Sequence, residues 1–132
     1  MNGPPPLRLE VLAEPLAVCR LGPRDPAPAW ASSGPLQALV RSEGELSAVC
    51  ADRAVPPGVR AERGFRALRV AGPLDFALTG VLAAIAAPLA REGVSIFAVS
   101  TFDTDYVLVR EGDLGRALAA LAAAGHDVGP ER

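Results

Sequence analysis

The amino-acid sequence predicts an α+β fold with a strand-rich first half and two amphipathic helices in its second half. Residues 7–50 contain short apolar runs and alternating apolar and polar residues, which are typical of β-strands. Leucines then recur at spacings of three and four in two later stretches, and this is the period of a helix with one buried face. Between those stretches lies a segment rich in β-branched residues that a polar turn interrupts.

The chain has 132 residues, of which 50% are hydrophobic and 21% are charged, and this is the composition of a globular protein. The apolar runs are short and carry charges between them, so we expect no segment to span a membrane. The first residues lack the basic start and the apolar stretch of a signal peptide, which favours a cytoplasmic location. The 13 basic residues are all arginines scattered singly, whereas a nucleic-acid-binding surface needs a local positive stripe. We therefore expect no nucleic-acid partner.

The cysteines and the single histidine do not predict a metal site. Cys19 and Cys50 each lie in an apolar stretch, where a reduced cysteine packs as a small core residue. Two separated cysteines and one histidine cannot form a structural zinc site. His126 follows the end of the second predicted helix, and we interpret it as a surface residue.

The first half is predicted to hold four strands. Residues 7–11 alternate apolar and charged side chains, and residues 16–21 form a second apolar run. A loop rich in proline follows, because residues 22–28 cannot continue either regular structure. Two further runs at 36–40 and 46–50 flank an acidic turn, in which Gly44 is expected to adopt a positive φ.

The second half begins with a strand at residues 65–70 and a helix over 77–92. Asp75 is the candidate N-cap of this helix and Gly93 its candidate stop. Pro88 conflicts with the helix because it deletes one backbone hydrogen bond, and a kink in the last turn is the expected accommodation. The predicted buried face of the helix consists of Leu78, Leu82, Ile85 and Leu89.

A hairpin and a second helix complete the pattern. Residues 94–99 are predicted to form a central strand covered on both faces, and a polar turn at 100–104 leads to a returning strand at 106–109. The second helix covers residues 113–124, with Gly125 as its stop, and a last edge strand starts at Asp127. This order predicts the split βαβ, ferredoxin-like arrangement, in which two helices cover one face of an antiparallel sheet. The strands of the first half would cover the other face or extend the sheet sideways.

Two long motifs resemble a known family. Residues 72–82 and 96–109 are similar to a subfamily of small bacterial tandem-ACT proteins that is related to the repeats of the CASTOR arginine sensors. The resemblance covers residues 65–128, and it is thinner before them, over 45–50 and 64–68. A faint internal similarity between residues 40–49 and 99–109 supports a duplication. The resemblance implies a reduced ACT-like half at residues 1–62, followed by a βαββαβ ACT domain at residues 63–132.

The resemblance also implies regulatory amino-acid binding without catalysis, at a site where two ACT units meet. Arginine is one candidate ligand by analogy with the sensors. Tandem ACT units form such sites between units and this chain offers one complete copy, so we expect a homodimer. The motif positions of the family fall on the loop and helix start at Gly72, Asp75, Phe76 and Thr79, and on the hairpin at Ser100, Thr101, Asp103 and Asp105.

The residue types fit such a site on chemical grounds. A helix N-terminus near Asp75 could hold a carboxylate, and Gly72 allows close approach of the backbone. The carboxylates of Asp75, Asp103 and Asp105 could accept hydrogen bonds from an ammonium or a guanidinium. Asp105 opens a strand, where aspartate is disfavoured, and this favours a functional role.

Purely structural roles remain as alternatives for the same residues. Asp75 could serve only as an N-cap, Asp103 only as a solvated turn residue, and Phe76 as a core residue. Ser100 and Thr101 could satisfy only the backbone of the turn.

No catalytic motif is present in the sequence. A Gly-x-Ser-x-Gly elbow, a phosphate loop and a metal-binding histidine pair are all absent, and residues 103–105 lack the longer ligand series of a calcium loop. We therefore expect neither an enzyme nor a resident cofactor. Two hypotheses remain: a sensor that binds an amino acid, or a structural dimerisation module that binds no ligand.

Overall fold

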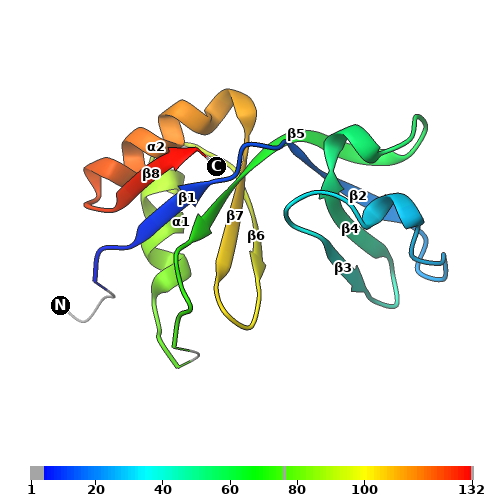
Figure 1. Ribbon diagram of the computed structural model, residues 1–132, viewed down its shortest axis with the longest axis horizontal. Coiled ribbons are helices and arrows are strands. Elements are labelled where there is room, and N and C mark those ends of the chain that lie inside the picture. The colour runs from blue at the N-terminus through cyan, green and yellow to red at the C-terminus, as the bar shows by residue number, and fades with distance from the viewer. Residues whose placement is uncertain (1–4, 76, 132) are drawn as a thin grey trace. The chain divides into compact units, whose positions relative to one another are not determined.

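The computed structural model describes residues 5–75 and 77–131. Its contacts divide the chain into two compact units, one formed by Met1–Ala13 with Arg66–Arg132 and the other by Glu14–Phe65. The elements in chain order are β1 (Arg8–Val11), β2 (Leu16–Leu21), a 3-10 helix (Ala29–Ala31), β3 (Ala38–Arg41), β4 (Leu46–Ala51), a 3-10 helix (Asp52–Ala54), β5 (Arg60–Val70), α1 (Val81–Arg91), β6 (Ile96–Ser100), β7 (Asp105–Arg110), a 3-10 helix (Glu111–Asp113), α2 (Leu114–Ala123) and β8 (Asp127–Glu131) (Figure 1).

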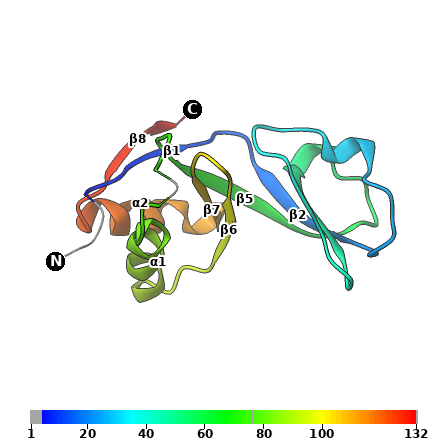
Figure 2. The same ribbon diagram turned by 90° about the horizontal axis from the view of Figure 1, so that it is seen from below.

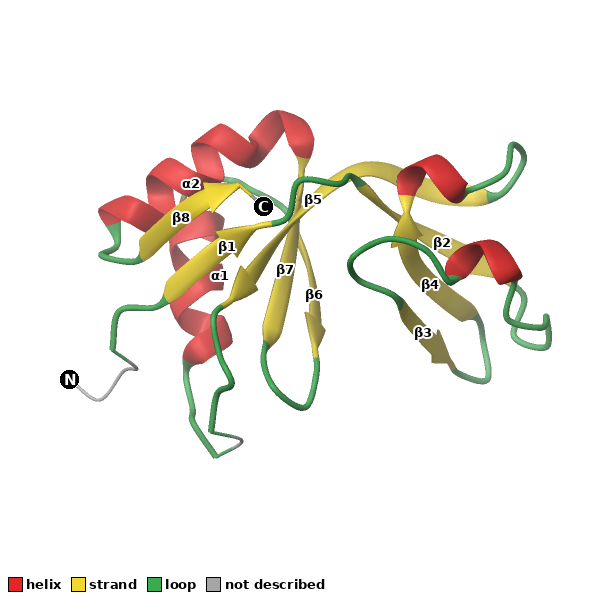
Figure 3. Cartoon of the chain, viewed as in Figure 1, coloured by secondary structure: helices red, strands yellow, loops and turns green. Residues whose placement is uncertain are grey.

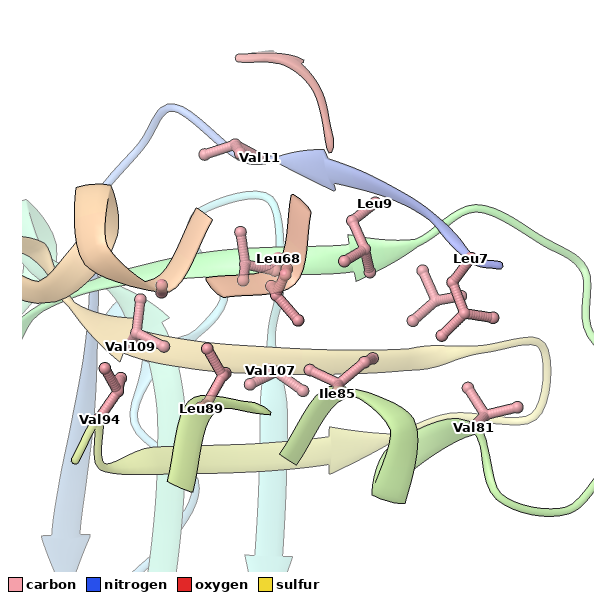
Figure 4. Close-up of a cluster of buried hydrophobic side chains, with 13 residues drawn as sticks. Leu7, Leu9, Val11, Leu68, Val81, Ile85, Leu89, Val94, Val107 and Val109 are labelled. Atoms are coloured by element: carbon pink, nitrogen blue, oxygen red, sulfur yellow. The ribbon is translucent and has the colours of Figure 1, made fainter. Parts of the chain in front are cut away.

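The unit that contains both helices is built on strands in the order β6-β7-β5-β1-β8. Both helices lie on one side of these strands (Figure 2), and side chains of α1 and of the sheet point toward one another (Figure 4). The predicted α+β, ferredoxin-like architecture is confirmed for this unit. The core consists of Leu7, Leu9, Val11, Leu68, Val70, Val81, Ile85, Leu89, Val94, Val107, Val109, Ala117 and Leu121.

The position of β1 differs from the prediction. We expected the N-terminal strands to cover the sheet or to extend it sideways. Instead β1 lies between β5, to which it runs antiparallel, and β8, to which it runs parallel. The reason is the alternation of residues 7–11, because Leu9 and Val11 are 0% and 3% exposed and belong to the helix-covered core. The division into residues 1–62 and 63–132 stays a prediction.

The strand β6 also differs from the prediction. It was expected to be central and covered on both faces, but within the described residues it pairs only with β7 and lies at an edge of the sheet. Its residues are half-buried or exposed, whereas β7 carries the fully buried Val107, Leu108 and Val109. A run of apolar residues does not distinguish an edge strand from a central one, because the position of a strand in the sheet depends on which other strands pair with that strand.

Helix α1 starts four residues later than predicted. Its N-cap is Gly80, with a φ of +82°, rather than Asp75. Asp75 forms a turn of its own, in which its Oδ1 accepts the Ala77 N–H at 2.9 Å and its carbonyl oxygen accepts the Leu78 N–H at 2.9 Å. An aspartate that binds nearby backbone in this way competes with the helix. Leu78 therefore lies outside the helix and is 41% exposed.

Both helices end at the predicted glycines. After α1, the Gly93 N–H donates to the Ala90 carbonyl at 3.0 Å and the Val94 N–H donates to the Leu89 carbonyl at 2.9 Å. This pair of bonds is a Schellman motif, which needs a residue of positive φ, and Gly93 has a φ of +71°. The same motif ends α2, where Gly125 has a φ of +94°.

His126 is not the surface residue that we expected. It is partly buried, its Nδ1 accepts the Leu7 N–H at 3.0 Å, and its Nε2 lies 3.1 Å from the Ala84 carbonyl oxygen. The histidine directly follows the end of α2, and that end packs beside the start of β1. Nothing in the local sequence indicated these two partners.

The unit of residues 14–65 is an antiparallel sheet in the order β3-β4-β2-β5, to which β5 contributes only its first part. It contains two 3-10 helices and no α-helix, and these short helices are the red segments of this unit in Figure 3. The turn between β3 and β4 is closed by the Ser42 N–H and the Glu45 carbonyl at 2.9 Å, and Gly44 does not have the expected positive φ. Its small core contains Ala17, Cys19, Ala31, Ala48, Cys50 and Val55, with both cysteines free and buried as predicted.

Neither of the two helices that the structure describes has the length and apolarity needed to cross a membrane. In the same part of the chain, no group of three or more His, Cys, Asp and Glu side chains is arranged to hold a metal ion.

Candidate functional site

A pocket of about 200 Å³ lies between the loop that follows β5 and the turn of the β6–β7 hairpin. Both segments extend from the same end of the helix-bearing unit (Figure 1). Residues 74–81 of the first segment and 100–105 of the second thus form one pocket although they are separate in the sequence. Its lining consists of Leu74, Asp75, Leu78, Val81, Ser100, Thr101, Phe102, Asp103, Thr104 and Asp105.

Hydrogen bonds from its own side chains and backbone close the hairpin turn. Ser100 and Asp105 face each other at the last strand pair, and the Ser100 hydroxyl donates to Asp105 Oδ1 at 2.6 Å. The Thr101 N–H donates to the Thr104 carbonyl at 2.8 Å, and Thr101 Oγ1 accepts the Thr104 N–H at 3.2 Å. Thr101 thus satisfies backbone groups of the turn, as one of the alternatives proposed, whereas the Ser100 hydroxyl binds a side chain instead. Aspartate is disfavoured at the start of a strand, and here the Ser100 hydroxyl is the hydrogen-bond partner of Asp105.

Thr104 joins the hairpin to the end of β5. Its side chain is 4% exposed, and its hydroxyl donates to the Val70 carbonyl at 2.6 Å. Next to it, the Leu74 N–H donates to the Asp103 carbonyl at 2.8 Å. These two bonds hold together the two walls of the pocket. A threonine in a polar turn looks like any other turn residue in the sequence, so no local signal could have identified this role.

Gly72 lies where the two walls come closest. A Cβ atom at this position would be 3.0 Å from the Leu74 nitrogen and 3.3 Å from the Asp103 carbonyl oxygen, which are the two atoms of the bond between the walls. Such contacts are tighter than a side chain tolerates without movement of the backbone. Two segments of this chain therefore approach each other closely at Gly72, although Gly72 itself does not line the pocket, and a role of Gly72 toward a ligand stays a prediction.

The first turn of α1 borders the pocket through Val81. No side chain caps this end of the helix, because the N-cap residue Gly80 has no side chain. The first N–H groups of a helix have no partner within it, and the helix dipole favours an anion near them. This end of α1 can accept the carboxylate of a ligand.

The charged side chains of the pocket are all acidic. Asp75 and Asp103 are exposed and Asp105 is half-buried, whereas none of the lining residues is basic. The uncharged lining residues are the polar Ser100, Thr101 and Thr104 and the apolar Leu74, Leu78, Val81 and Phe102. Phe102 is 82% exposed. Carboxylates bind ammonium and guanidinium groups through charge-assisted hydrogen bonds. The pocket therefore suits a ligand that carries a positive group.

The predicted site residues fall into three groups. The structure brings together Asp75, Ser100, Thr101, Asp103 and Asp105 in the pocket lining. Gly72 and Thr79 are exposed and are not among the lining residues, and Phe76 lies outside the described residues. Whether any of them binds a ligand stays a prediction. The lining residues that the sequence analysis missed are Leu74, Leu78, Val81, Phe102 and Thr104.

Two family models match the chain. The model of the ACT domain matches residues 60–123, and a model of an N-terminal domain matches residues 14–58. The crystal structure of protein Atu0741 from Agrobacterium tumefaciens is 36% identical in sequence, covers 98% of this chain and 96% of that protein, and superposes with a TM-score of 0.91.

Two further relatives cover less of the chain or are more distant. The human protein named cytosolic arginine sensor for mTORC1 subunit 1 is 40% identical over 58 residues, which are 43% of this chain and 18% of that protein. The chain thus matches less than a fifth of the length of that sensor. The regulatory subunit of aspartate kinase from Thermus thermophilus shares the fold with a TM-score of 0.59 at 15% identity, covering 86% of this chain and 94% of that protein.

Proposed function

This chain belongs to the ACT-domain family, and we propose that it is a non-catalytic regulatory protein that binds an amino acid in the pocket between the β5–α1 loop and the β6–β7 hairpin. The observation that carries the proposal is the complementary placement of charge in this pocket. The open N-terminus of α1 borders the pocket at Val81, Asp75 lies on the same wall, and Asp103 and Asp105 lie on the hairpin wall. A free amino acid has a carboxylate for the helix N-terminus and an ammonium for the aspartates.

Arginine is the first candidate among the amino acids. Its guanidinium would supply a second positive group to a pocket whose charged lining is entirely acidic. The similarity to a protein named as an arginine sensor supports the same choice. An acidic amino acid would meet repulsion from all three carboxylates.

We further propose that a second copy of the chain completes the site. The pocket is open to solvent, and two of its apolar lining residues, Leu78 and Phe102, are 41% and 82% exposed. Apolar side chains at the rim of a polar pocket are suited to contact with a partner. Covering them would also withdraw the ligand from water, which strengthens its charged hydrogen bonds.

The experiment that tests the proposal is a thermal-shift screen against the twenty amino acids, followed by calorimetry. We expect arginine to raise the unfolding temperature and glutamate to leave it unchanged, because a ligand that binds only the folded state stabilises it by mass action. No shift with any amino acid at millimolar concentration, with no heat of binding, would contradict the proposal.

The rival function is a structural dimerisation module without a ligand. Light scattering and thermal unfolding together separate the two hypotheses when both are measured with and without arginine. Both predict a particle of twice the 13.6 kDa chain mass, but only the sensor couples its assembly or its stability to the ligand. A monomer under both conditions would contradict the proposed second copy.

A further inference from the structure

Helix α1 contains a proline that leaves one of its carbonyl groups without a helical partner. Pro88 lies inside the helix, buried, four residues before the cap at Glu92. In an α-helix the N–H of each residue donates to the carbonyl four residues earlier, and proline has no N–H. The carbonyl of Ala84 therefore lacks the hydrogen bond that a residue with an N–H at position 88 would have donated.

The side chain of His126 lies within hydrogen-bonding distance of this carbonyl. Its Nε2 lies 3.1 Å from the Ala84 carbonyl oxygen. Its other ring nitrogen, Nδ1, is 3.0 Å from the Leu7 nitrogen, and a backbone N–H can only donate. Nδ1 must therefore be the unprotonated acceptor, which places the ring proton on Nε2. That N–H then donates to Ala84, so both nitrogens of the neutral imidazole are satisfied.

The end of α2 sets the backbone position from which the imidazole reaches α1. His126 is the final residue of the Schellman motif, in which its N–H donates to the Leu121 carbonyl at 3.1 Å. The next residue, Asp127, donates its N–H to the Leu7 carbonyl at 2.8 Å and begins β8. The N–H and the carbonyl of Leu7 are thus both hydrogen-bonded, and the ring lies between the start of β1 and α1.

We propose that His126 replaces the hydrogen-bond donor that Pro88 removes from α1, and that it is a positioning residue for this helix. It ties α1 to the start of β1 and to the end of α2 through one imidazole ring. The same helix borders the pocket at Val81, less than one helical turn before Ala84. These hydrogen bonds hold the pocket wall whether or not the pocket binds a ligand.

A double-mutant cycle tests the proposal in the full chain. Its four proteins are the wild type, His126→Ala, Pro88→Ala and the double variant, compared by urea unfolding. Pro88→Ala restores the N–H at position 88, so the Ala84 carbonyl regains its helical partner. We expect His126→Ala to raise the unfolding equilibrium constant about tenfold more in the wild-type background than in the Pro88→Ala background, because only the first leaves the carbonyl unpaired. The lost bond to Leu7 and the lost packing of each side chain cancel in the cycle. Equal effects of His126→Ala in both backgrounds would overturn the proposal.

Two measurements support the cycle. They do not use the alanine variants, so they remain informative if one of those fails to fold. The ring ¹⁵N spectrum of the wild-type protein at pH 8 should show a proton on Nε2 and none on Nδ1, and the opposite tautomer would overturn the proposal. His126→Gln carries an amide donor near the position of Nε2, whereas His126→Leu has none. We expect the glutamine variant to retain slow amide hydrogen exchange in α1 and the leucine variant to lose it; equally fast exchange in both would count against the replacement of the donor.

Discussion

The three carboxylates that line the pocket differ in how far the chain satisfies them. Asp105 accepts the Ser100 hydroxyl and Asp75 accepts the Ala77 N–H, whereas the side chain of Asp103 has no such bond to a described residue. A carboxylate has lone pairs for about four hydrogen bonds, so each of the three keeps acceptor capacity for a ligand. The local bonds of Asp75 and Asp105 orient these two side chains and still leave acceptor sites for a ligand.

Replacing Asp105 by asparagine tests the charge alone. Asparagine keeps an oxygen that can accept the Ser100 hydroxyl, so the hairpin should stay folded while the negative charge is lost. We expect calorimetry to show roughly tenfold weaker binding of the best amino acid from the screen, because a hydrogen bond to a charged group contributes about 1.5–3 kcal/mol. The matched control is Asp25→Asn, which alters a carboxylate that accepts the Gly22 N–H outside the pocket. Equal affinities of the two variants would exclude Asp105 from binding.

The two cysteines are predicted to be unreactive in the folded chain. Burial, followed by the neighbouring Cys50, raises the pKa of the Cys19 thiol from 9.0 to about 11, and burial also raises the pKa of Cys50. Thiolate is the reactive form, so iodoacetamide at pH 8 should label neither residue until the protein is unfolded in urea. Mass spectrometry of the native and the denatured protein gives the comparison, and rapid native labelling would contradict the burial.

The same pKa shifts predict how stability depends on pH. A thiol whose pKa is raised by folding binds its proton more tightly in the folded state than in the unfolded state. This contribution to stability is complete below pH 9.0, and it is lost as the pH rises from 9.0 toward 11. Urea unfolding should therefore show the free energy of unfolding decreasing over this range, and less so in Cys19→Ala. A decrease of the same size in that variant would assign the effect to other groups.

At the scale of elements, the ends of the helices are determined by backbone conformation rather than by side-chain caps. Neither α1 nor α2 has a side-chain hydrogen bond at its N-cap. Both end in a Schellman motif at a glycine of positive φ, and in α1 the two residues Leu89 and Val94 that flank this motif pack in the core. The glycines after each helix therefore determine where the helix ends more strictly than the N-cap residues determine where it begins.

A pair of glycine substitutions tests this account. Gly93 has a φ of +71° and open space where a Cβ atom would lie, so Gly93→Ala suffers only from its backbone conformation. We expect it to destabilise the protein by about 1 kcal/mol. Gly115 lies in the first turn of α2 without a positive φ and also in open space, so Gly115→Ala should stabilise by roughly 0.5 kcal/mol. Thermal unfolding of both variants gives the comparison, and a loss of stability in both would contradict it.

At the scale of the whole molecule, the first strand and the last strand belong to the same sheet. The strand β1 lies between β5 and β8, so the helix-bearing unit is assembled from both ends of the sequence. Leu9 and Val11 of β1 are buried in the same core as α1 and α2. The ACT unit of this chain therefore requires residues that precede the other unit in the sequence.

This arrangement predicts that residues 63–132 do not fold cooperatively without β1. Their sheet would lose the strand between β5 and β8, and the core would lose the three buried side chains of Leu7, Leu9 and Val11, each contributing about 1.5–3 kcal/mol. Circular dichroism of this fragment should show a broad thermal transition, and a synthetic peptide of residues 1–13 should sharpen it. A cooperative transition of the fragment alone would show that β1 is dispensable.

Much of the fold and half of the site followed from local patterns in the sequence. The hairpin between Ile96 and Arg110, the stops at Gly93 and Gly125 and the pocket carboxylates were predicted because each depends on neighbouring residues. The start of α1 was wrong by four residues because the turn at Asp75 competes with the helix over the same backbone groups.

The sequence by itself determined the types of elements, their order and the acidic character of the pocket, since period, turn chemistry and charge are properties of adjacent residues. Only the tertiary structure decided that β1 enters the sheet beside β8, that Thr104 joins the two pocket walls and that His126 reaches a carbonyl left unpaired by Pro88. Each of these contacts joins residues more than thirty positions apart in the chain. Such pairings depend on how buried apolar faces fit together and on which polar groups then remain without a partner, and no local pattern encodes either.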